Sequence, residues 1–129
     1  MKFYFLDTSI IIDYHKNKKE VTEFIDNLEG SLTSSYICLA ELYEGIYRVK
    51  NSQEAEKAVL NFFENLTNVY GINFEIAQKF GQLRADLKSR GKVIGDMDTL
   101  IAATCVAHDL TLVTHNKKHF SRIPELKIL

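Results

Sequence analysis

Four acidic residues stand at positions where an α/β chain can gather them, and not on solvated helix faces. Asp7 ends the apolar run Phe3–Leu6, and Glu41 lies in the opening turns of a predicted helix. Asp96 and Asp98 stand at the mouth of a second, strongly apolar helix. Positions of these kinds share one edge of a doubly wound parallel sheet, beyond the carboxyl ends of its strands. We therefore expect the four carboxylates to converge.

The chemistry that such a group of acids predicts is phosphodiester hydrolysis. Carboxylates crowded together without basic partners raise one another's pKa, so a chain that keeps them there needs a cation to neutralise them. Oxygen ligands suit Mg²⁺ or Mn²⁺, which bind one or two carboxylates together with waters and a substrate phosphate. Such an ion orients and acidifies a water and offsets the charge on a leaving oxygen.

Each acid also has an ordinary structural explanation. Asp7 could simply cap the helix that is predicted to begin near Ile10. Either Asp96 or Asp98 could cap the apolar helix, and because only one residue can fill the N-cap position, the other needs a separate reason. Glu41 could be an exposed helical glutamate.

Hydroxyl and imidazole side chains accompany the acids. Thr8 and Thr114 each end a predicted strand, where they could hydrogen-bond a ligand carboxylate or a metal-bound water, or merely finish the strand. His115 and His119 are four residues apart, but no thiolate or third histidine accompanies them. We therefore expect solvent-exposed histidines and not a zinc site.

The hydrophobic pattern predicts an α/β fold, a three-layer sandwich with a central mainly parallel sheet flanked by helices. Phe3–Leu6 has the composition of a strand buried on both faces. Residues 110–114 form a second convincing strand, rich in β-branched side chains. Shorter strands are predicted at residues 32–34, 69–70 and 126–129. Helical periodicity appears from residues 10, 20, 36, 51, 73 and 99, and the last of these helices is apolar nearly all round.

Length and composition describe one ordinary globular domain over residues 1–129. With 46% hydrophobic and 26% charged residues the chain is neither disordered nor fibrous. Acids interrupt the apolar runs near the N-terminus, so we expect no signal-peptide core, no membrane span and a cytoplasmic protein. The cysteines, Cys38 and Cys105, lie in predicted helices with apolar faces, so we expect reduced core thiols.

Any polyanionic partner must bind to a local patch of positive charge on this protein. The formal net charge is −1, so no global positive field announces a nucleic-acid binder. The densest basic cluster lies on the outer face and exit of a predicted helix and consists of Arg84, Lys88, Arg90 and Lys92. Such a face is commonly just solvated. Alternatively, these side chains could hold an RNA backbone through its phosphates.

Four stretches of the chain resemble the successive signatures of PIN-domain ribonucleases. They are FLDTS at residues 5–9, LAELYEG at 39–45, MDTLIAA at 97–103 and LVTHNKKHF at 112–120. The resemblance is closest to the VapC toxins of type II toxin–antitoxin systems. The signatures run in the expected order from the first strand to the tail, so the resemblance covers essentially the whole chain.

The resemblance implies roles for individual residues. Asp7, Glu41 and Asp98 match the family's three principal acids, with Asp7 and Asp98 as the main magnesium ligands. Asp96 matches no obligatory position and is an additional candidate ligand. The family's fourth acidic position is occupied here by Asn116, which can coordinate through its oxygen but adds no charge, so a second metal is in doubt.

The resemblance also implies a substrate and partners. Thr8 and Thr114 match the small hydroxyl residues that line the family's pocket. The expected activity is Mg²⁺- or Mn²⁺-dependent cleavage of tRNA, rRNA or mRNA that leaves a 3′-hydroxyl and a 5′-phosphate. The expected partners are a VapB-like antitoxin, laid across the groove, and a second copy of the chain. A dimer also agrees with the aromatic surface that a small monomer must otherwise bury, from Tyr36, Tyr43, Phe62 and Phe63.

Two other functions remain open from the sequence. A catalytically idle PIN fold that binds RNA or a protein partner draws support from Asn116. Metal binding and the effect of Asp7→Asn on turnover would distinguish it. A phosphotransfer enzyme with Asp7 as nucleophile is the third reading. The haloacid-dehalogenase pattern, however, requires a second aspartate at the position of Ser9.

Overall fold

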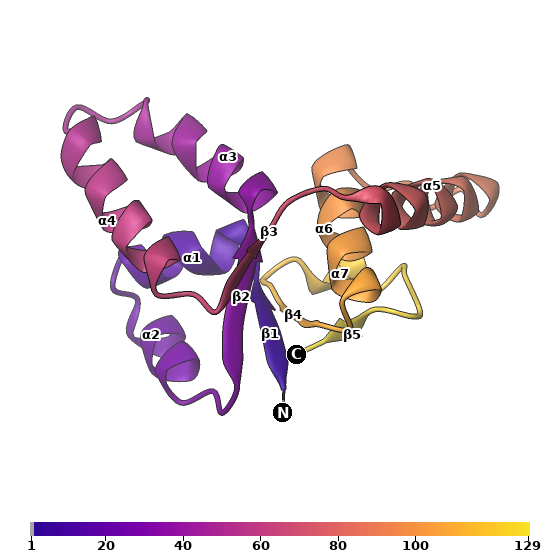
Figure 1. Cartoon of the computed structure of the whole chain (residues 1–129), viewed down its shortest axis with the longest axis horizontal. Helices are drawn as coiled ribbons and strands as arrows, with labels where there is room; N and C mark the ends of the chain where they lie inside the picture. Colours follow the sequence, from indigo (N-terminus) through magenta and orange to yellow (C-terminus); the bar gives the residue numbers. More distant parts are fainter. Residues whose placement is uncertain (1) are drawn as a thin grey trace.

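A single parallel sheet runs through the centre of the molecule (Figure 1). The computed structural model describes residues 2–129. The strands stand in the order β3-β2-β1-β4-β5, and every neighbouring pair is parallel. Their bounds are Phe3–Leu6 for β1, Ser31–Ser35 for β2, Asn68–Tyr70 for β3, Thr111–Val113 for β4 and Lys127–Ile128 for β5. Because all strands point the same way, their carboxyl ends meet at one edge.

Helices cover both faces of this sheet (Figure 1). On one face lie α1 (Thr8–His15), α2 (Lys19–Asp26), α3 (Tyr36–Ile46) and α4 (Ser52–Glu64). On the other lie α5 (Phe74–Ser89), α6 (Asp96–Ala107) and α7 (Lys117–Phe120). The predicted three-layer sandwich is therefore confirmed, and the sheet is parallel throughout, not merely for the most part.

Strand β1 is central and buried on both faces, as its run of apolar residues predicts. The side chain of Phe5 packs into the core shared with α5 and α6, whereas Tyr4 and Leu6 pack into the core shared with α1 to α4. Phe5 and Leu6 are completely buried. Alternate side chains of a strand point to opposite faces, so three consecutive apolar residues contribute to both cores at once.

Strand β2 is polar in sequence yet lies beside β1 in the interior. Thr33 donates its hydroxyl to the carbonyl oxygen of Tyr4 at 2.8 Å, and Ser34 donates to that of Leu6 at 3.0 Å. Both side chains are fully buried. These bonds satisfy hydroxyl groups that would otherwise cost free energy in the core. The sheet therefore tolerates a strand that lacks the usual apolar run.

Two helices begin earlier than the sequence suggests, and both differences concern the acids. Helix α1 begins at Thr8 and not near Ile10, because Asp7 occupies the N-cap position. Helix α6 begins at Asp96 and not at Thr99, with Gly95 at its N-cap. The alternative explanation, that one of the two aspartates caps this helix, is therefore excluded, since both lie in its first turn.

Other local predictions agree with the structure. Asn73 caps α5 by accepting a hydrogen bond from the Ile76 amide at 2.9 Å. Gly91 follows the end of that helix at φ +65°, a left-handed conformation that glycine adopts without a Cβ penalty. Cys38 and Cys105 are buried free thiols. Across residues 2–129, no helix is long and apolar enough to cross a membrane.

Candidate active site

Asp7 lies at the carboxyl end of the central strand and is held there by two donors. Its Oδ1 atom accepts a hydrogen bond from the Thr8 amide at 2.8 Å, which is the helix cap. Its Oδ2 atom accepts a hydrogen bond from the Thr114 hydroxyl at 2.6 Å, just beyond β4. The side chain is buried, with 6% of its surface exposed. Capping therefore occupies one carboxylate oxygen, and the neighbouring strand fixes the other.

Two further carboxylates approach Asp7 from different helices. The Thr8 hydroxyl donates to Oε1 of Glu41 at 2.7 Å, which ties α3 to the start of α1. Asp98, in the first turn of α6, lies within 3.4 Å of the Asn116 amide nitrogen. Glu41 and Asp98 are both half-buried. One strand and two helices thus bring together three of the four acids that the sequence singled out.

The pKa of each of the three carboxylates is raised above its ordinary value. Burial is the largest cause for Asp7, and the hydrogen bonds from Thr114 and Thr8 oppose it only in part. Burial also raises the pKa of Glu41 and of Asp98, and the negative charge of Asp7 adds to both. The charges that oppose these shifts come from His115 and His119, and none comes from a described lysine or arginine. The site therefore holds negative charge without a strong cationic partner.

The donor set fits a hard divalent cation that keeps part of its water shell. Within residues 2–129, no three His, Cys, Asp or Glu side chains are arranged to ligate one ion directly. Mg²⁺ commonly takes only one or two carboxylates and completes its shell with waters. Cys38 is completely buried, and burial raises the pKa of its thiol to about 11.

Asp96 does not join the three acids. It forms an ion pair with Arg84 on α5, and its side chain is largely exposed. Residues two apart on a helix point in different directions, so Asp96 and Asp98 cannot face the same site. Asp96 therefore has a structural role of its own, because its ion pair with Arg84 joins α6 to α5.

The basic cluster on α5 is partly neutralised. Arg84 is paired with Asp96, and Arg90 pairs with Asp86 at 2.8 Å and also donates to the carbonyl oxygen of Arg122. Lys88 and Lys92 are exposed. Half of the predicted RNA-backbone cluster therefore has intramolecular partners that anchor the α5–α6 connection.

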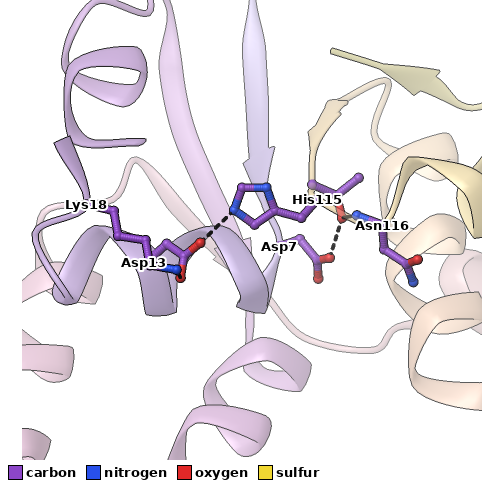
Figure 2. A network of polar contacts seen from close by, with 6 residues as sticks. Asp7, Asp13, Lys18, His115 and Asn116 are labelled. Carbon is purple, nitrogen blue, oxygen red and sulfur yellow. Dashed lines mark hydrogen bonds and ion pairs between the residues drawn. The ribbon is translucent and has the colours of Figure 1, made fainter. Parts of the chain in front are cut away.

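His115 and His119 are exposed, as the sequence predicts, but each also makes a polar contact near the site. His115 Nε2 lies 2.9 Å from Oδ2 of Asp13, and Asp13 also pairs with Lys18 at 3.1 Å (Figure 2). His119 Nδ1 lies 2.9 Å from the Asn116 amide nitrogen. Sequence reasoning missed Asp13 altogether, because its partner His115 is 102 residues away and neither belongs to a recognisable pair.

Asn116 connects several of these groups. Its backbone amide donates to the Thr114 hydroxyl at 2.9 Å, and its side-chain amide nitrogen faces both Asp98 and His119. Figure 2 shows Asn116 on the side of Asp7 away from Asp13. A carboxylate at this position would add a fourth negative charge beside Asp98, whereas the amide offers Asp98 a donor.

The raised pKa of Asp7 predicts how stability varies with pH in the absence of divalent metal. The folded state holds the Asp7 proton more tightly than the unfolded state, so wild-type stability is lost as pH rises from the ordinary value of 3.8 through the raised pKa. Asp7→Asn removes this titrating group. We therefore expect its free energy of unfolding to increase relative to that of the wild type as the pH rises through this range. Urea denaturation in chelator measures it.

The matched control is Asp13→Asn, on the same helix. Lys18 is the largest cause that lowers the pKa of Asp13. This carboxylate therefore contributes stability above its ordinary value of 3.8, and that stability is lost as pH falls through the lowered pKa. The Asp13→Asn difference should vary with pH in the opposite sense. A pH-independent Asp7→Asn difference would contradict the raised pKa of the buried Asp7 carboxylate.

Comparison with known proteins identifies relatives of this chain. The PIN domain family profile matches residues 4–126. The chain is 34% identical to ribonuclease VapC2 of Rickettsia felis over 128 residues, which cover 95% of this chain and 93% of that protein. It is 36% identical to ribonuclease VapC1 of Methanocaldococcus jannaschii over 120 residues, 93% of this chain and 80% of that protein.

Solved structures give the same result for the fold. The structure of DNA-bound VapBC from Salmonella typhimurium contains a chain that matches with a TM-score of 0.90 and 30% identity, over 100% of this chain and 98% of that one. VapBC2 from Rickettsia felis, bound to a DNA fragment from its promoter, matches with a TM-score of 0.89 and 30% identity, over 98% and 97%.

Proposed function

This chain belongs to the PIN-domain family and is a VapC-type ribonuclease, and we propose that Asp7, Glu41 and Asp98 form its active site. The observation that carries the proposal is the meeting of three carboxylates from β1, α3 and α6 without a lysine or arginine to neutralise them. Ribonucleases of this family depend on metal in general. We propose Mg²⁺ or Mn²⁺ as the ion that this site takes.

The three acids have different tasks in this proposal. Asp7 and Asp98 would hold the ion. A bound divalent cation supplies a Lewis acid that acidifies a water and offsets charge on the leaving oxygen. Glu41 accepts a proton from the attacking water through Oε2, which receives no hydrogen bond from residues 2–129, and its raised pKa suits it to that task.

Hydroxyl groups position these carboxylates. Thr8 orients two of them, since its amide holds Asp7 and its hydroxyl holds Glu41. Thr114 donates to Asp7 and accepts from the Asn116 amide, so it joins the end of β4 to the site. Thr8 and Thr114 therefore hydrogen-bond the carboxylates of the site, which is one of the two roles that the sequence left open for them. Asn116 in turn holds Asp98 through a neutral donor.

We propose a VapB-like antitoxin, RNA and a second copy of this chain as partners, in the cytoplasm. The Salmonella typhimurium and Rickettsia felis relatives are found in VapBC complexes. The RNA would be a tRNA, an rRNA or an mRNA. A homodimer is supported by an apolar surface near the start of α3, where Tyr36 is 59% exposed and Ile72 57%. Of the other aromatic residues considered, Phe63 is buried, and Tyr43 and Phe62 are half-buried.

The termini of the RNA products test the chemistry of the proposal. Hydrolysis by water does not use the ribose 2′-hydroxyl, so we expect products with 5′-phosphate and 3′-hydroxyl ends. Ligation of the products to adapters specific for each kind of end, followed by sequencing, measures them. Products that carry 2′,3′-cyclic phosphates would contradict metal-assisted hydrolysis at these acids.

A further inference from the structure

An RNA substrate needs positive charge close to the acid cluster. The net charge of the protein is −1, so its overall field does not attract a polyanion. The three carboxylates repel phosphate at short range. Because Arg84 and Arg90 on α5 are engaged with Asp96 and Asp86, that helix offers less free charge than its sequence suggests. Of that cluster, only Lys88 and Lys92 have no ion pair with an acid in residues 2–129, so exposed lysines elsewhere are candidates as well.

Helix α7, which directly follows Asn116, carries free positive charge. Lys117 and Lys118 are exposed, and neither forms an ion pair with an acid in residues 2–129. Four other lysines do have such partners, namely Lys18, Lys19, Lys79 and Lys127. The charges on α7 are thus available to a ligand, whereas several others in the chain are balanced.

The two lysines have a fixed position relative to the carboxylates. Asn116 directly precedes them, contacts Asp98 through its side chain and contacts the Thr114 hydroxyl through its amide. Phe120 is completely buried and anchors the other end of the helix. The chain therefore holds the Lys117 and Lys118 backbone in place while their side chains remain in solvent.

We propose that Lys117 and Lys118 of α7 form a phosphate-binding surface that holds the RNA backbone at the edge of the acid cluster. The inference rests on the proposed ribonuclease function and names where that site takes its substrate. A lysine ammonium group attracts phosphate oxygens as a single positive charge. This surface therefore contributes affinity for the RNA backbone but does not distinguish one base sequence from another. Base contacts, if any, come from other residues.

The salt dependence of RNA binding tests the surface. Each phosphate contact contributes about 0.7 to the slope of log affinity against log salt for a single strand, so Lys117→Gln with Lys118→Gln should flatten it by about 1.4. The affinity at 0.15 M salt should fall about tenfold. Fluorescence anisotropy with a labelled single-stranded RNA, from 50 to 200 mM salt, measures both in an Asp7→Asn background that leaves the RNA intact.

The matched control is Lys50→Gln with Lys57→Gln, which removes the same charge from exposed residues near and on α4. Its salt slope should equal that of the parent. Lys88→Gln with Lys92→Gln compares α5 in the same assay. Equal slopes and affinities for the α7 pair and the control would overturn the inference, as would a loss found only in the α5 pair.

The binding and cleavage assays together distinguish failure of the α7 surface from failure of the proposed ribonuclease function. Cleavage by the protein with native Asp7 tests the ribonuclease, whereas the anisotropy slopes test only where RNA binds. Cleavage with an unchanged α7 slope would reject the surface and keep the enzyme. Both lysines are exposed, so thermal unfolding should give the same Tm for the α7 pair and its parent, which excludes misfolding as the cause.

Discussion

The Asp7→Asn variant is expected to lose RNA cleavage by about 10³-fold, equivalent to about 4 kcal/mol of transition-state stabilisation. Asp7 is the most buried of the three acids and the only one held by the backbone of one element and the side chain of another. Asparagine keeps the shape and can still cap α1, but it removes the charge that attracts the cation. Single-turnover cleavage of labelled RNA measures the loss.

A second aspartate controls for nonspecific effects of this change. Asp109→Asn also replaces a carboxylate by an amide, at an exposed residue with φ +55° that asparagine tolerates as well as aspartate does. Its carboxylate pairs with Lys127, away from the three acids. We expect cleavage at the wild-type rate. If Asp7→Asn cleaves as fast as Asp109→Asn, Asp7 is no part of the active site.

The second large effect distinguishes two aspartates that are almost adjacent in the chain. Asp98→Asn should reduce cleavage by about 10² to 10³-fold, because Asp98 joins Asp7 in holding the cation. Asp96→Asn should change the rate by less than about 3-fold, because Asp96 is an exposed partner of Arg84. Rates measured at saturating metal in parallel assays compare the two.

This pair of variants is informative because the sequence alone does not separate them. Both aspartates precede the apolar part of α6, and either could have been its cap or a ligand. The structure separates them through helix geometry, with Asp98 facing Asn116 and Asp96 facing α5. A large loss in Asp96→Asn together with an active Asp98→Asn would reverse the assignment.

Much of the fold follows from local pattern. A run of apolar residues ending in Asp7 predicts a strand buried on both faces, and β1 lies at the centre of the sheet. The alternation of strands and helices predicts a parallel sheet, which places the acids at one edge. These predictions succeed because they depend on hydrophobic periodicity and strand direction, which the chain expresses locally.

The contacts that fix the side chains were not predictable in the same way. Asp7 meets Thr114 across 107 residues, and Asp13 meets His115 across 102. Such pairs depend on the order of strands, which places β4 beside β1, and no periodic pattern in the sequence specifies that order. The hydroxyls of β2 are a further case, since Thr33 and Ser34 enter the core only because β1 offers carbonyl acceptors.

The most direct test of the proposed centre is cleavage of a mixed tRNA and ribosomal RNA pool by metal-stripped protein. In chelator the RNA should stay intact, and addition of excess Mg²⁺ or Mn²⁺ should produce discrete fragments. With Asp98→Asn, the same addition should produce these fragments about 10² to 10³-fold more slowly. Cleavage that persists undiminished in chelator would contradict the assignment of the three carboxylates to a divalent cation.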